Sequence, residues 1–429
     1  MKKTNRFLIA TLIGVFVSIA PRLEAQTATN VTQLIRDSQA ALAAQKTADA
    51  ERLARRAVDV DPGYPAAWRQ YGLVLQHSGK TQEAQAAFQR TVSMDAKDET
   101  AWRGLALACW QAHQGDEAVR ALAAYLKLKP EDAAAWRDLA AWLAELTRIE
   151  EAADALHHAV ELKPDDAVAW RDLGSLDIQL KRDGPAAEAL GHATQLNPDD
   201  ASAWRSLATA LSHLERYGEA LPALEHVTAL KPDDASAWHD KAAVLVRLEK
   251  PEPAAAALER LTQLTPNDAA AWREWGAVLT QLNQIDRASA ALERVTQLAP
   301  NDASAWREWG FLLVRQNKAE PAVAALDQAV KLDPKDAAAW RELGSLHQKA
   351  GRIPEAVKAF EQSLAARPGD PAVLRDLGWA LWTLGRRDEA VARLTESVEA
   401  GVEARDRVVY QVAARLSEEG ASDQAIAFL

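Results

Sequence analysis

The stretch Ala169-Trp170-Arg171-Asp172-Leu173-Gly174 recurs, with small variations, along most of the 429-residue chain. Its tryptophan returns every 34 residues, at positions 68, 102, 136, 170, 204, 238, 272, 306 and 340. A proline keeps the same spacing at 62, 130, 164, 198, 232, 266, 300, 334 and 368, and Ala96 stands at the position where the series lacks one. A fixed period of this length indicates stacked repeats, which extend a chain without a central core.

Each repeat is predicted to hold two helices joined by a short turn. In residues 168–200 the apolar side chains with helical spacing are Trp170, Leu173, Leu176 and Leu180, then Ala186, Leu190, Ala193 and Leu196. A turn is expected at 181–185, and Pro198 ends the second helix. Asp200 is then placed to cap the next helix. The same cap aspartate is found at 98, 132, 166, 200, 234, 268, 302, 336 and 370.

These positions resemble the tetratricopeptide repeat. One repeat fills the family pattern with Trp170, Leu173, Gly174, Ala186, Leu190 and Pro198. A small residue opens the second helix in every repeat, from Ala84 and Ala118 to Ala356 and Ala390. The resemblance implies an all-α fold, a right-handed superhelical solenoid of helix–turn–helix 34-residue repeats.

The repeats divide the chain into four expected segments. Residues 1–25 form a signal peptide, and residues 26–64 hold a degenerate repeat without the tryptophan. Ten repeats follow from 65 to 404, the last with Leu374 in place of tryptophan. Residues 405–429 are a partial repeat or cap, with a first helix through Val408, Val409, Val412 and Leu416 and a second that opens at Ala425.

The amino terminus predicts export. Basic residues precede an apolar run at 7–20, and Ala25 is the expected cleavage site. The run is shorter than the roughly 20 residues of a spanning helix, although an uncleaved anchor is the alternative. Cleavage removes four basic and one acidic residue, so the mature chain has 46 basic and 60 acidic residues and a net charge of −14. That balance argues against nucleic-acid binding, and a periplasmic or secreted location is expected.

No catalytic, metal-binding or cofactor-binding motif is found, so the sequence predicts a protein that is not an enzyme. The single cysteine, Cys109, is expected to be buried and inert. The adjacent His157 and His158 point about 100° apart on a helix, which does not suit a metal site. No cofactor is implied.

The arginine after the tryptophan recurs although the fold does not require it. The residues are Arg69, Arg103, Arg137, Arg171, Arg205, Arg273, Arg307, Arg341 and Arg375, and His239 takes the place once. In the tetratricopeptide family this position resembles one that lines the concave groove, where guanidinium groups suit acidic or extended peptide segments. Alternatively, each arginine pairs with a carboxylate of the adjacent repeat, since the next residue is usually acidic.

Four aromatic residues resemble groove-facing positions of the same helices. They are Trp110, Phe311, Trp379 and Trp382. The alternative for the last two is packing against the predicted helix at 406–419, and Trp275 and Trp309 are expected in the core.

The resemblance implies a non-catalytic scaffold that binds protein or peptide segments in its groove. Its setting is expected to be the bacterial envelope, in secretion, polysaccharide export or outer-membrane assembly. Two alternatives remain. The repeats are the targeting arm of a larger enzyme or channel, as the apolar end Phe428-Leu429 suggests, or the solenoid self-associates.

Overall fold

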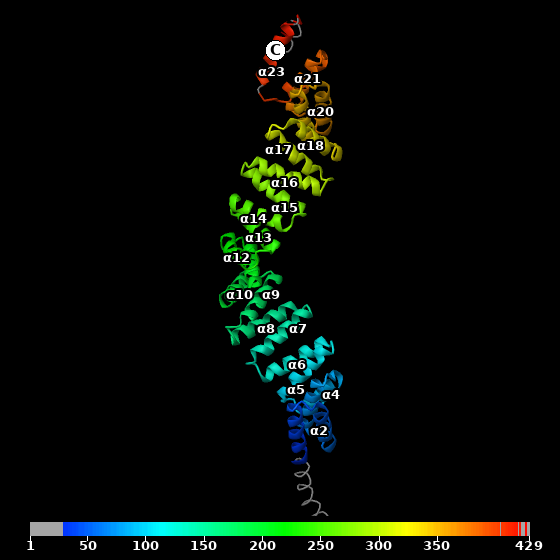
Figure 1. The fold of residues 1–429 in the computed structure, drawn as a ribbon, viewed down its shortest axis with the longest axis vertical. Coiled ribbons are helices and arrows are strands. Elements are labelled where there is room, and N and C mark those ends of the chain that lie inside the picture. The colour runs from blue at the N-terminus through cyan, green and yellow to red at the C-terminus, as the bar shows by residue number, and fades with distance from the viewer. Residues whose placement is uncertain (1–28, 404, 419, 422–424, 427–429) are drawn as a thin grey trace, which may run out of the picture. The chain divides into compact units, whose positions relative to one another are not determined.

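A computed structural model describes residues 29–403, 405–418, 420–421 and 425–426, and their regular structure is α-helical (Figure 1). The predicted signal peptide and the ending at Phe428-Leu429 lie outside these residues. Contacts divide the chain into two compact units, which meet in sequence between Arg216 and Tyr217. In the described part, no helix has the length and apolar character needed to cross a membrane.

The first unit contains a helical segment at 29–43 and then ten helices. The first helices of its repeats are α3 (Pro65–His77), α5 (Glu99–Gln111), α7 (Ala133–Glu145), α9 (Ala167–Gln179) and α11 (Ala201–His213). The second helices are α2 (Thr47–Val60), α4 (Thr81–Met94), α6 (Gly115–Leu128), α8 (Ile149–Leu162) and α10 (Asp183–Leu196).

The second unit continues the alternation. Its first helices are α13 (Ala235–Arg247), α15 (Ala269–Gln281), α17 (Ala303–Arg315), α19 (Ala337–Lys349), α21 (Pro371–Thr383) and α23 (Arg405–Glu418). Its second helices are α12 (Tyr217–Leu230), α14 (Pro251–Leu264), α16 (Ile285–Leu298), α18 (Ala319–Leu332), α20 (Ile353–Ala366) and α22 (Arg387–Glu399). Within each unit, neighbouring helices pack in pairs, so the predicted all-α solenoid of helix pairs is confirmed.

The cap aspartates begin the first helices as predicted. At each of the nine positions the side chain accepts a hydrogen bond from an amide two or three residues later. In α9, for example, Oδ1 of Asp166 accepts from the amide of Ala169 at 3.1 Å. The first amides of a helix have no partner within it, so this bond stabilises the start of each repeat.

The recurring tryptophan and proline are joined by a hydrogen bond. The indole Nε1 of Trp170 donates to the backbone carbonyl of Pro164, six residues earlier, at 2.9 Å. Other repeats form the same bond, and Trp102 forms it with Ala96 at 3.0 Å. Because the acceptor is a backbone carbonyl, the bond survives where alanine replaces proline.

The turn between the two helices contains a residue in the left-handed backbone region. The position lies 11 residues after the tryptophan, and its φ is between 54° and 78° in every repeat from 79 to 385. Gly79, Gly351 and Gly385 occupy it without steric cost, whereas Thr147 holds it with φ 60°. The amide of the next residue closes the helix end, as Lys80 does by donating to Leu75.

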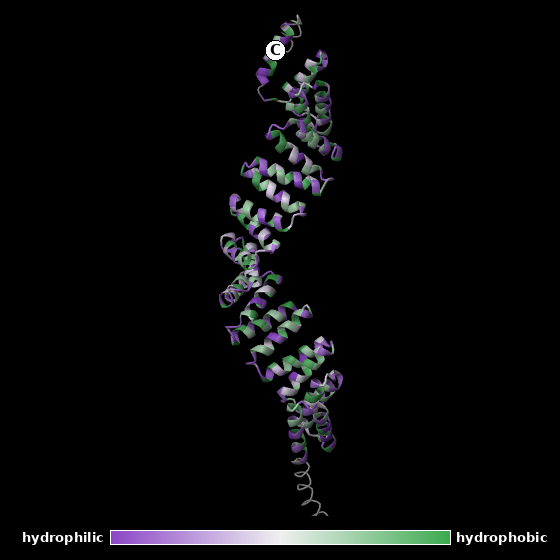
Figure 2. Cartoon of the chain, in the orientation of Figure 1, coloured by the Kyte–Doolittle hydropathy of each residue, from purple (hydrophilic) through white to green (hydrophobic). Residues whose placement is uncertain are grey.

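Small residues bring the two helices of a repeat together. The alanines that open the second helices are fully buried, including Ala84, Ala186 and Ala356. The ring of Phe88 in α4 fits between Gly72 and Gly104, where an added Cβ would lie within 3 Å of it. Along the helices of both units, hydrophobic residues alternate with hydrophilic ones (Figure 2).

The remaining core residues follow the predicted pattern. Cys109 is buried, and burial raises the pKa of its thiol, which fits the expected inert side chain. Trp275 is buried, and Trp309 is half-buried against two parts of the second unit's core. In α23, Val408, Val412 and Leu416 are buried as expected.

Candidate binding face

The first helices of successive repeats contact one another within each unit, as α3 does with α5, α9 with α11, and α19 with α21. Their exposed side chains therefore form a common surface, which we call the first-helix face. This face carries the predicted arginines, and in the first unit it is hollowed by cavities.

Most of these arginines are bound to the cap aspartate of the following repeat. The guanidinium donates to the aspartate 29 residues later in the pairs Arg69–Asp98, Arg103–Asp132, Arg137–Asp166, Arg171–Asp200, Arg273–Asp302 and Arg307–Asp336, at 2.7 to 3.1 Å. Pairing between repeats was one of the two sequence interpretations. The partner, however, is the cap residue and not the acid that follows the next arginine. The acidic residue after the next arginine lies farther away; for example, the guanidinium of Arg103 is 3.8 Å from the carboxylate of Asp138.

The other members of the series differ. Arg375 donates to its own neighbour Asp376 at 2.7 Å, and Arg205 also has an interaction partner. His239 lies 3.4 Å from Glu274. Arg341 is exposed and forms no ion pair with any residue that the structure describes.

Two of the shared aspartates, Asp200 and Asp302, are held as anions by their contacts. Burial would raise the pKa of Asp200, but the hydrogen bond from the amide of Ala203 and the contact with Arg171 outweigh it, so this pKa is lowered. The pKa of Asp302 is lowered in the same way by the amide of Ala305 and by Arg273. A ligand that takes one of these arginines must therefore compete with a charged carboxylate in place.

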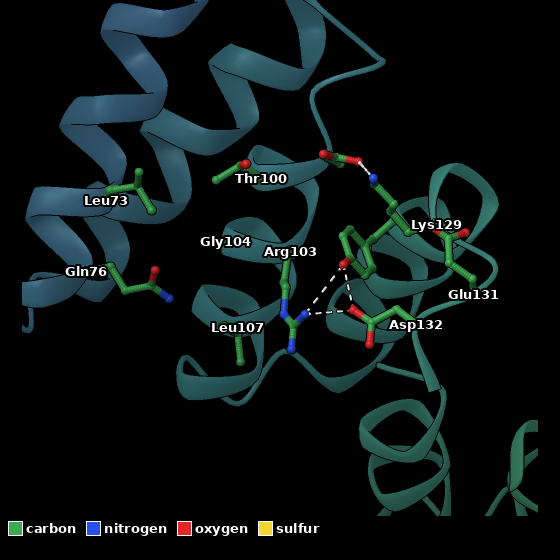
Figure 3. A pocket seen from close by; sticks show the side chains of 11 residues that line it. Leu73, Gln76, Thr100, Arg103, Gly104, Leu107, Lys129, Glu131 and Asp132 are labelled. Atoms are coloured by element: carbon green, nitrogen blue, oxygen red, sulfur yellow. Dashed lines mark hydrogen bonds and ion pairs between the residues drawn. The ribbon is translucent and has the colours of Figure 1, made fainter. Parts of the chain in front are cut away.

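One cavity of the first-helix face lies beside Arg103 and has a volume of about 470 Å³. Its wall combines Leu73 and Gln76 of α3 with Arg103 and Leu107 of α5 and with Asp132 at the start of α7 (Figure 3). We call it the Arg103 cavity. Its rim also includes Glu99, Thr100, Lys129 and Glu131.

A three-residue network closes one side of the Arg103 cavity. Nη1 of Arg103 donates to Asp132 at 2.8 Å, and the hydroxyl of the buried Tyr125 donates to the same carboxylate oxygen at 2.7 Å. The guanidinium also lies 5.5 Å from the centre of the Tyr125 ring. Burial favours a lower pKa for Arg103, but the hydrogen bond with Tyr125 and the charge of Asp132 outweigh it, and the pKa is raised.

Two further cavities lie along α5, α7 and α9. One, of about 300 Å³, is lined by Arg137, Asp138, Ala141, Asp172 and Ser175 among others. The second, of about 410 Å³, is lined by Trp110, Gln111, His113, Gly115, Glu145 and Leu146. Trp110 stacks on Trp142 with ring centres 4.8 Å apart, so its ring is half-buried at the edge of this cavity.

The other predicted aromatic residues are covered to different extents. Phe311 is half-buried against the core of the second unit. Trp382 is 7 % exposed and belongs to the same buried cluster as Val408 and Val412 of α23, so little of its ring is open to a partner. Arg415 of α23 lies over the ring of Trp379 at 5.2 Å. The two tryptophans thus pack against the last helix, which was the alternative interpretation.

Two notable residues were missed by sequence reasoning. Tyr125 stands where the neighbouring repeats have Thr91 and Ala159. Asp177 stands where they have Leu143 and Leu211, in the core. Each differs from the residues at the same position of neighbouring repeats. An alignment of the repeats with one another would therefore have singled out both. Within the described residues, no group of three potential metal ligands is found.

Comparison with known proteins identifies the family. Three family models described as tetratricopeptide repeat match residues 75–143, residues 241–305, and residues 185–238, 307–371 and 342–401, which together are more than half of the chain. The protein belongs to the tetratricopeptide-repeat family. A search of the curated proteins finds no match.

Several solved structures are similar to this chain. The structure of Naa15/Naa10 bound to HypK-THB is 14 % identical, covers 93 % of this chain and 78 % of that chain, and has a TM-score of 0.50, so the likeness is one of fold. YrrB, described as a TPR protein with an unusual peptide-binding site, is 25 % identical over 46 % of this chain and 99 % of its own, with a TM-score of 0.38. MamA 41-end from Desulfovibrio magneticus RS-1 is 22 % identical over 39 % and 94 %, with a TM-score of 0.36.

Proposed function

We propose that this protein is a non-catalytic scaffold of the bacterial envelope and that its first-helix face binds segments of partner proteins. The observation that carries the proposal is the set of open cavities on that face. Binding sites are usually concave, and these cavities are open at the surface between first helices of successive repeats. Exposed apolar side chains such as Leu107, which is 36 % exposed, line the Arg103 cavity. Within a unit, stacked repeats present an extended surface to a bound segment.

The envelope setting rests on residues 1–25, whose basic start, apolar run and small residue at Ala25 are typical of a secretory signal. Secretion, polysaccharide export and outer-membrane assembly are the settings that the family resemblance suggests. Cell fractionation and amino-terminal sequencing of the native protein test this part. Recovery in the periplasm or medium with Gln26 as first residue supports it, and recovery in the cytoplasm with Met1 intact overturns it.

Binding is tested with two matched variants, in each of which an exposed alanine is replaced by tyrosine. Ala141 is exposed in the 300 Å³ cavity of the first-helix face, and Ala86 is exposed on the second helix α4. In Ala141→Tyr the new ring fills the cavity, whereas Ala86→Tyr adds the same ring outside the face. Tagged protein is recovered from native envelopes, and its partners are identified by mass spectrometry. A partner retained by the parent and by Ala86→Tyr but lost by Ala141→Tyr supports the proposal. Equal recovery by all three contradicts a binding role for this face.

A further inference from the structure

We propose that the Arg103 cavity receives a lysine or arginine side chain of the bound segment. This inference rests on the proposed function, because it specifies the partner chemistry of the same face. The sequence alone suggested an acidic partner for the arginines, and the contacts around this cavity point to the opposite charge.

The first argument is the cavity's apolar wall. Leu73 of α3 and Leu107 of α5 lie on the side away from Asp132 (Figure 3), and α5 presents no side chain at Gly104. A volume of about 470 Å³ admits a long side chain. Lysine and arginine bury their methylene stems against apolar surface while the charged end stays near polar groups.

The second argument is the balance of charge. The rim has two cations and three carboxylates. Both cations are already paired, Arg103 with Asp132 at 2.8 Å and Lys129 with Glu99 at 3.0 Å. Glu131 is exposed, and its carboxylate has no partner among the described residues. An entering cation therefore finds an unpaired carboxylate, whereas an entering anion must break an existing pair.

The third argument is the network that fixes Arg103. Tyr125 is confined to this repeat, since the equivalent residues in its neighbours are Thr91, Ala159 and Ala193. Its hydroxyl donates to the carboxylate that Arg103 uses, and its ring lies beside the guanidinium. Arg103 is thus held toward Asp132 by the carboxylate and by Tyr125 together, and it is poorly placed to turn toward an anionic ligand.

The test uses the full-length protein and five pools of fluorescent decapeptides. All positions are randomised except one central residue, which is lysine, arginine, norleucine, glutamine or glutamate. Binding is followed by fluorescence polarisation at low salt. We expect the lysine and arginine pools to bind about fivefold more tightly than the norleucine pool, the factor expected of one partly exposed ion pair. The glutamate pool is expected to bind most weakly.

Two glutamate variants locate the effect. Glu131→Gln removes the unpaired carboxylate and is expected to abolish the preference for lysine and arginine. Glu188→Gln makes the same change on α10, at an exposed glutamate without a partner among the described residues, and is expected to keep the preference. Circular dichroism confirms that both variants fold.

The remaining outcomes separate this inference from the proposed function. Equal binding of all pools, tightest binding of the glutamate pool, or an unchanged preference in Glu131→Gln overturns the inference while peptide binding stands. Failure of every pool to bind overturns both.

Discussion

Asp98 links two successive repeats, because one of its carboxylate oxygens accepts from Arg69 and the other from the amide of Ala101. The distances are 2.8 Å from Nη1 of Arg69 to Oδ2 and 2.9 Å from the amide to Oδ1. The amide bond caps α5, and the arginine belongs to α3 of the preceding repeat. Helix capping and contact between repeats thus depend on a single side chain, and the two contributions can be separated by mutation.

The equivalent pair Arg137–Asp166 tests which contribution is larger. Asp166→Ala removes both the cap of α9 and the ion pair, and we expect a loss of about 1–2 kcal/mol in the free energy of unfolding. Arg137→Met removes only a partly exposed ion pair, and we expect a loss below about 1 kcal/mol. Urea unfolding measures both. Asp166→Asn retains a capping oxygen and should resemble Arg137→Met, and a larger loss in Arg137→Met than in Asp166→Ala would contradict this account.

Asp177 is expected to weaken the repeat that contains it. The side chain is 1 % exposed, neither carboxylate oxygen accepts a hydrogen bond from the described residues, and the nearest Arg182 nitrogen is 3.9 Å away. Leucine occupies this position in the adjacent repeats. Because an unpaired polar group in a core is costly, we expect Asp177→Leu to raise the free energy of unfolding at pH 7 by roughly 1–3 kcal/mol. The reverse change, Leu211→Asp, should lower it.

The gain from Asp177→Leu should depend on pH. Burial raises the pKa of Asp177, against the smaller opposing effects of His157 and Arg182. A carboxyl group with a raised pKa in the folded state stabilises folding fully below its unfolded pKa of about 3.9, and that contribution is lost as the pH rises through the folded value. The difference between variant and parent should therefore be larger at pH 7 than at pH 4. Comparison of the two proteins cancels the acid-induced loss at cap residues such as Asp200. A difference that grows on acidification would rule out this role for Asp177.

Thr147 offers a test of the turn. Its φ of 60° is unfavourable for a β-branched residue, whereas glycine adopts it readily at the equivalent Gly79. We expect Thr147→Gly to raise the free energy of unfolding by about 1 kcal/mol, since the left-handed conformation costs other residues roughly 1–2 kcal/mol. Thermal unfolding measures the change. Gly79→Thr is the matched reverse variant and should be destabilising. Stabilisation by Gly79→Thr would show that φ does not limit this turn.

The sequence predicts the repeat architecture well because the signals that set it are local. A cap aspartate binds amides two or three residues away. The spacing of apolar residues indicates each helix separately, from residues within that helix. The nine predicted caps, the buried alanines of the second helices and the burial of Cys109 follow from such signals.

The contacts that join repeats were harder to foresee. The hydrogen bond from Arg171 to Asp200 depends on how far one first helix is displaced along the next one. The spacing of residues in the sequence does not determine this displacement. Tyr125, which lines the Arg103 cavity, occurs at this position in one repeat, so the average pattern conceals it.

The constant separation of arginine and cap aspartate bears on how an array of this kind changes its length. Each pair spans 29 residues, and both partners recur every 34. Duplication or excision of 34 residues, cut at equivalent points, supplies every arginine with an equivalent aspartate. An insertion between the two partners whose length is not a multiple of 34 shifts the aspartate away from its arginine. Genetic gain or loss of whole repeats thus preserves the pairing between neighbouring repeats, while other insertions disrupt it.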